Sequence, residues 1–192
     1  MAINLIKPVR IFFKEPQWEK VRGLFWFCFI TLVVHALWRI WSGNFQFAPI
    51  QSGVNTITSF LIVQVYNETI FILDHILNLS VTLEPQTIIT SNKIKLIFGA
   101  GAAGLKQMCQ FIILILLFPG FWKNKIWFIP LGIIIIHFTN VFRMLCFVVL
   151  AIHWPQQIQY AHDNYLRLLF YIVIFILWLF WVEKINYLKF KK

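Results

Sequence analysis

Three polar side chains could do chemistry in this chain. Arg143 and Asn140 lie deep in apolar sequence, and His162 lies just outside it. Arg143 lies inside the apolar run 133–150, and Asn140 precedes it by three residues, which places both on one helical face. A guanidinium keeps its charge, and burying one in a hydrocarbon layer costs at least about 2.5 kcal/mol. His162, just before the last apolar run, carries an imidazole that can take up and release a proton near neutral pH. We therefore expect Arg143 to line a polar site, oriented by Asn140, rather than to reach the lipid headgroups by snorkelling.

The composition is that of a protein embedded in a membrane. Of the 192 residues, 60% are hydrophobic, 18% aromatic and only 12% charged, against about 25% charged in a typical soluble domain. The net charge of +10 is concentrated before the first apolar run and after the last one, a pattern that marks the cytoplasmic side of spans. Nucleic-acid binding would need a basic face with stacking aromatics outside the bilayer, which the sequence lacks. We predict an all-α polytopic membrane protein.

The apolar runs give the predicted elements. A bilayer span takes about 20 apolar residues, and four stretches qualify: 23–41, 99–118, 126–151 and 165–182. A fifth, 53–79, has apolar residues at helical spacing but also several polar ones, so we expect an interfacial or re-entrant amphipathic helix. Its expected apolar face is formed by Phe60, Val63, Tyr66, Ile70, Leu73 and Leu77. Between this helix and the next span, β-branched residues around a turn at 90–93 predict a short extracytoplasmic β-hairpin in 80–98.

Positive charge sets the expected orientation. With the basic residues 1–22 inside, four spans return both the C-terminal tail and the Lys123/Lys125 loop to the cytoplasm, as the positive-inside rule asks. Counting 53–79 as a fifth span would place both outside. We therefore expect a single membrane domain over residues 1–192 in a bacterial cytoplasmic membrane, with both termini cytoplasmic and the site facing outward. The first apolar run lacks a small-residue cleavage site, so no cleavable signal peptide is expected.

The spacing of the cysteines argues against a disulfide framework or a metal site, and the context of the glycines argues against a dinucleotide site. Cys28, Cys109 and Cys146 form neither a CxxC pair nor a disulfide framework, and no His/Cys spacing favours a metal. The glycine-rich run 99–104 lacks the βαβ context of a dinucleotide loop. Its small residues allow close helix packing, and they also leave room for an extended substrate backbone. We expect no cofactor and no metal.

The order of these motifs resembles that of the exosortase/archaeosortase family of membrane-embedded cysteine transpeptidases, in its short Bacteroidota-type form. The family pattern is Cys-x-Gly-Leu, then Asn-x-x-Arg, then a later His. In this chain Gly104-Leu105, Asn140-x-x-Arg143 and His162 match it, over about residues 53–184. The resemblance implies cleavage of the C-terminal sorting tail of exported proteins at the outer face of the membrane. The new C-terminus would pass to a lipid or glycan acceptor, or to water, and only the product mass separates transfer from hydrolysis.

The resemblance also assigns roles to residues. It implies a nucleophile at position 102, a base at His162, and an oxyanion or substrate clamp at Arg143. Substrate-binding positions are implied at Asn140, Gly104 and Lys106.

The chain departs from the family pattern at the nucleophile. Position 102 is Ala102, and an alanine methyl cannot attack a carbonyl. Three explanations stay open: an engineered replacement of the native cysteine, a naturally inactive relative that binds tails without cutting, or a nucleophile at Cys109. With Cys109 as the nucleophile, the thiol lies two helical turns further along the same face. Its apolar neighbours there favour an inert buried thiol.

A non-catalytic protein is the rival hypothesis. In a membrane scaffold or transporter subunit, Arg143 would pair with Glu68 or Asp74. An ion pair should tolerate lysine at position 143, whereas a planar clamp for a carboxylate or an oxyanion should not.

Overall fold

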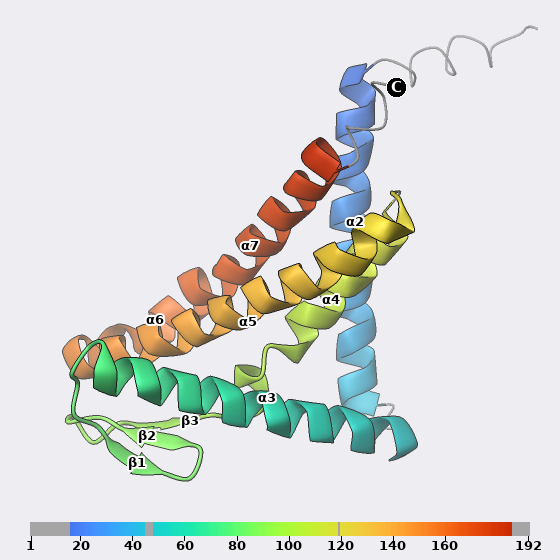
Figure 1. Cartoon of the computed structure of the whole chain (residues 1–192). Helices are drawn as coiled ribbons and strands as arrows, with labels where there is room; N and C mark the ends of the chain where they lie inside the picture. The colour runs from blue at the N-terminus through green and yellow to red at the C-terminus, as the bar shows by residue number, and fades with distance from the viewer. Residues whose placement is uncertain (1–15, 45–47, 119, 186–192) are drawn as a thin grey trace, which may run out of the picture. The chain divides into compact units, whose positions relative to one another are not determined.

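A computed structural model describes residues 16–44, 48–118 and 120–185, most of which are helical (Figure 1). We expected a single domain, and the chain forms two compact units, residues 1–45 and 46–192. The first unit contributes one described helix, α2 (Pro16–Asn44), and the second carries every other element and all the candidate site residues. Several basic residues that set the expected orientation lie outside the described residues: Lys7, Arg10, Lys14, Lys189, Lys191 and Lys192.

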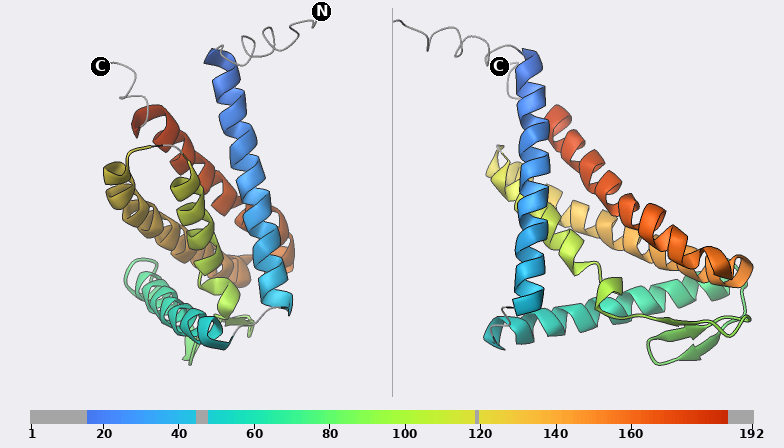
Figure 2. Two further views of the ribbon diagram at one scale, coloured as in Figure 1. Left: turned by 90° about the vertical axis from the view of Figure 1, so that its right-hand side faces the viewer. Right: turned by 180° about the vertical axis from the view of Figure 1, so that it is seen from behind.

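The second unit is built from three long helices and two short ones: α3 (Ala48–His75), α4 (Leu105–Leu117), α5 (Trp122–His153), α6 (Ile158–Ala161) and α7 (Arg167–Phe180). The π-helical turns His162–Leu166 and Trp181–Ile185 extend α7 at its two ends. In the views of Figures 1 and 2, α5 and α7 converge with the C-terminal end of α3 and with a small sheet at one end of the unit.

Among the described residues, four helices are long and apolar enough to cross a membrane, so the chain is a multi-pass membrane protein. They are Gly23–Trp41, Gln51–His75, Trp122–His153 and Asn164–Glu183. The helix α3 belongs to this set, although we expected it at the interface. The predicted span 99–118 does not belong to it. That stretch is helical only over α4, whose 13 residues reach about 20 Å, against about 30 Å of hydrocarbon core.

The apolar face predicted for the stretch 53–79 is confirmed only in part. Leu73 is buried, and Tyr66 and Ile70 are half-buried against the core, whereas Phe60 is 61%, Val63 40% and Leu77 43% exposed. The other buried residues of α3 are Ile62, Val65 and Thr69. In a membrane protein the lipid-facing side is as apolar as the core, so the periodicity of hydrophobic residues does not identify the packed face.

The predicted hairpin is confirmed and has one more strand than expected. Strands β1 (Thr82–Glu84), β2 (Thr87–Ile89) and β3 (Lys95–Ile97) form an antiparallel sheet in the order β1-β2-β3. In the turn between β2 and β3, the side-chain amide of Asn92 donates to the carbonyls of Ala151 (3.0 Å) and Ile152 (2.7 Å). These are among the last carbonyls of α5, which have no partner within the helix. Asn92 therefore fastens the sheet to the end of α5.

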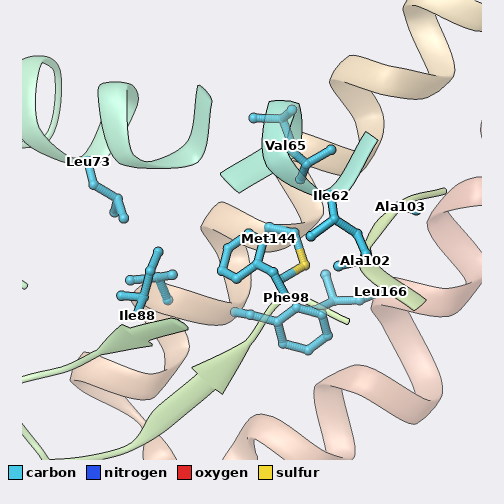
Figure 3. Packing of buried hydrophobic residues seen from close by; sticks show 12 residues of the cluster. Ile62, Val65, Leu73, Ile88, Phe98, Ala102, Ala103, Met144 and Leu166 are labelled. Atoms are coloured by element: carbon cyan, nitrogen blue, oxygen red, sulfur yellow. The ribbon is translucent and has the colours of Figure 1, made fainter. Parts of the chain in front are cut away.

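An apolar cluster joins the sheet, α3 and α5 around the start of α4 (Figure 3). Ile88 of β2 lies below Leu73 of α3, and Ala102 lies beside Ile62 and Leu166. The cluster holds the segment between the sheet and α4 against the middle of α3 and α5.

Lys125 is a buried helix cap rather than part of an exposed basic loop. It is 4% exposed, and its ammonium donates to the carbonyls of Leu116 (2.8 Å) and Phe118 (2.7 Å) at the end of α4. A cation at a helix C-terminus is stabilising. Only Lys123 of the predicted pair is exposed.

Candidate functional site

The site is built where α5 meets the turn that precedes α4. The guanidinium of Arg143 donates from Nη2 to the carbonyl of Gly101 at 2.7 Å, and the amide of Asn140 donates to the carbonyl of Ala102. The expected common face of Asn140 and Arg143 is confirmed, because both side chains reach the same turn. One of these carbonyls precedes the Cα of Ala102 and the other follows it. The helix α5 therefore holds the main chain on both sides of this Cα.

Gly104 has a conformational reason to be glycine. It precedes the first turn of α4 with φ = +72°, a left-handed conformation that side chains disfavour. A Cβ at this position would lie 3.1 Å from Nδ2 and 3.2 Å from Cγ of Asn140. Gly104 was expected to bind substrate, and in the structure it gives Asn140 the room to reach Ala102.

Arg143 is held by a carbonyl and two aromatic rings. Its guanidinium carbon lies 5.0 Å from the ring centre of Phe170 on α7 and 6.0 Å from that of Phe147. Such cation–π contacts stabilise a cation away from water. The Nε atom is buried and has no hydrogen-bond partner among the described residues. Arg143 therefore keeps donor capacity for a further acceptor.

The rival hypothesis expects Glu68 or Asp74 beside Arg143, and in the structure each of these carboxylates has a different partner. Glu68 of α3 contacts His137 of α5, with Oε2 and Nε2 2.8 Å apart, and Asp74 is exposed and lies 3.4 Å from Nδ1 of His75. Sequence reasoning missed the pairing of Glu68 with His137. The signal was present, because two ionisable residues in separate apolar helices each require a partner.

Ala102 lies in the 3-10 turn Ala100–Ala102 and is 6% exposed, with its methyl group in the apolar cluster (Figure 3). The expectation that Cys109 continues the same helix is wrong, because α4 begins only at Leu105 and the left-handed Gly104 separates it from the turn. Cys109 is half-buried, as is Cys146, and both are free thiols.

The remaining candidates, Lys106 and His162, lie on α4 and in the π-helical turn before α7. Lys106 is half-buried in the first turn of α4, within electrostatic range of Arg167 on α7. The backbone of His162 begins the π-helical turn His162–Leu166, and its side chain lies outside the described residues. The described residues contain no group of three His, Cys, Asp or Glu side chains that would hold a metal ion.

Comparison with protein-family models, curated proteins and solved structures finds no match to this chain.

Proposed function

We propose that this chain is an exosortase-like protein that binds the C-terminal sorting tails of exported proteins and that position 102 is its nucleophile position. One observation supports this most directly. The two motif residues of α5, Asn140 and Arg143, donate to the carbonyls on either side of Ala102. An inert packing turn needs no charged donor there, whereas a nucleophile must be fixed beside the group that stabilises its transition state.

With a cysteine at position 102, the residues support acyl transfer. The imidazole of His162, a role that rests on the resemblance, would take the thiol proton. The thiolate sulfur would then bond to the carbonyl carbon of the scissile peptide. The remaining N–H donors of Arg143 would stabilise the resulting oxyanion.

Collapse of this tetrahedral species would break the C–N bond. The leaving amine would take the proton from the imidazolium, and a thioester would remain on the enzyme. Water, or an amine acceptor such as a lipid or glycan headgroup, would then release the new C-terminus.

With alanine at position 102, the chain can bind but cannot form a thioester. The surroundings of Ala102 are apolar, which disfavours a thiolate. A cysteine at this position would therefore depend on Arg143 and the imidazole for its ionisation. We place the protein in a bacterial cytoplasmic membrane with both termini inside and position 102 towards the exterior, on the strength of the basic flanks of its spans.

The test uses a set of reporter proteins, each ending in the C-terminal tail of one exported protein from the source genome. Ala102→Cys is co-expressed with each reporter, and loss of the tail is followed by mass. At least one reporter should be cut by Ala102→Cys and none by the parent chain. Ala102→Ser is the matched control, because a hydroxyl is a much weaker nucleophile than a thiol. Failure of Ala102→Cys to cut any reporter would reject the proposal.

A further inference from the structure

We infer that the outer edge of β3, together with the bare backbone of Gly99 and Gly101, is a docking track for an extended polypeptide segment. The inference rests on the proposed function, and it names the part of the partner that binds: the extended stretch of the exported protein's tail that leads to the bond to be cut. The segment would lie as an added strand beside β3, leading to position 102 (Figure 1).

The main chain of β3 has unused hydrogen-bonding groups on its outer edge. Thr90 N–H donates to Ile94 (3.1 Å) and Phe98 N–H donates to Gln86 (2.8 Å), which fixes the hydrogen-bonded pairs of the β2–β3 ladder. Because such pairs alternate in antiparallel strands, the main-chain groups of Lys95 and Ile97 point away from β2. Among the described residues, only the Ile97 carbonyl has a partner there, Gly99 N–H at 3.2 Å. Two amides and one carbonyl are therefore left for another backbone.

Two glycines continue this edge towards position 102 and are not required by the fold. A Cβ added to Gly99 or Gly101 would meet no atom within 4 Å, and neither residue has a positive φ. Both are exposed, as is Ala100 between them. Gly104 and Gly132, by contrast, are needed for packing. Open glycines beside a strand edge are where a second backbone can approach closely.

The lysine on β3 does not protect the outer edge of the strand against pairing with another strand. A lysine on an edge strand commonly blocks pairing, but the ammonium of Lys95 reaches across the sheet to Glu84 of β1, 3.4 Å from its Oε2. Ile97, beside it, is 72% exposed. An arriving strand would find free amides and an apolar side chain, the combination used in β-strand addition.

The short edge favours a substrate segment over a second copy of this chain. Three main-chain groups are too few for a stable symmetric dimer, which needs roughly 800 Å² per partner. They suit a segment that binds for one reaction and must then leave. Pairing of two copies through β3 is the alternative that the experiment tests.

The experiment forms a disulfide between Ile97→Cys and single cysteines placed in turn along the C-terminal tails of the reporters. It uses the full chain with alanine at position 102, in membranes, under a mild oxidant. Leu83→Cys on the opposite edge strand, at a residue 48% exposed, is the matched control. The parent chain reports the background from its native cysteines.

We expect a cross-link at position 97 and not at position 83. Adding Gly99→Val or Gly101→Val should lower its yield by about tenfold or more, the effect of losing about one well-made backbone hydrogen bond. Gly53→Val should leave the yield unchanged, because a Cβ at Gly53 of α3 also meets no atom within 4 Å.

Three results would overturn the docking track: equal yields at positions 83 and 97, a cross-linked dimer of the chain at position 97, or no cross-link while Ala102→Cys cuts the reporters. The last would leave the proposed function standing. A cross-link at position 97 without any cleavage by Ala102→Cys would reject the transpeptidase site and keep the track as a peptide-binding edge. Absence of both would reject both.

Discussion

The side-chain amide of Asn140 donates a hydrogen bond to the main-chain carbonyl of Ala102. Asn140 is fully buried, and its Oδ1 has no partner among the described residues. The contact joins α5 to the turn before α4, and Gly104 makes it sterically feasible. This contact, together with that of Arg143 to the Gly101 carbonyl, sets the geometry of position 102.

Replacing Asn140 with leucine should destabilise the protein by about 1–3 kcal/mol, because the buried carbonyl of Ala102 loses its donor. The control is Thr139→Val, since the Thr139 hydroxyl bonds only Ile135 of its own helix (2.8 Å) and its loss should cost less than about 0.5 kcal/mol. Unfolding in detergent, followed by circular dichroism, measures both. Equal effects of the two variants would show that the contact contributes nothing of its own.

Gly132 should tolerate alanine only when Phe111 is made smaller. A Cβ at Gly132 of α5 would lie 2.2 Å from the Phe111 ring of α4, and such overpacking costs about 1–3 kcal/mol. Phe111→Leu should restore part of the stability of Gly132→Ala, so that the double variant is more stable than the sum of the single effects predicts. Thermal unfolding in detergent tests this, and strict additivity would contradict the packing.

The pair Glu68 and His137 should be energetically coupled across α3 and α5. A double-mutant cycle with Glu68→Gln and His137→Phe should give a coupling of about 0.6–1.7 kcal/mol, the range found for polar contacts between membrane helices. Asp74→Asn, crossed with the same His137 variant, should give none, because Asp74 lies beside His75 instead. Coupling to Asp74 as large as that to Glu68 would refute the pairing.

The sequence sufficed for the fold class and for the shared face of Asn140 and Arg143. The spacing of Asn140 and Arg143 predicts a common face on any helix, and both side chains reach one turn. The β2–β3 hairpin follows from its turn residues in the same local way. These features depend on residues a few positions apart, where helical and strand geometry leave few choices.

Contacts between distant segments could not be predicted in this way. The buried face of α3 was predicted only in part, because lipid and core select the same residue types. The partners of Glu68 and Arg143 depend on how α3, α5 and the turn pack, and two carboxylates were equally plausible for Arg143 from the sequence. Lys125 follows the positive-inside rule in sequence, yet only tertiary packing reveals it as the cap of α4.

Arg143 should not be replaceable by lysine in an active protein. In the Ala102→Cys background, Arg143→Lys should lower reporter cleavage by about 100- to 1,000-fold, the effect of losing an oxyanion donor. Lysine carries the charge but not the planar set of donors. Arg39→Lys on α2 is the control and should keep full cleavage. Unchanged cleavage by Arg143→Lys would favour a simple charge pair instead.

The most direct test of the nucleophile position is the intact mass of the Ala102→Cys chain after brief exposure to a reporter that it cuts. We predict an added mass equal to the acyl fragment of the reporter, carried on residue 102, removed by hydroxylamine and absent from the parent chain. Cys109→Ala in the same background should leave this adduct in place. An adduct on Cys109, or cleavage with no thioester on residue 102, would contradict the account.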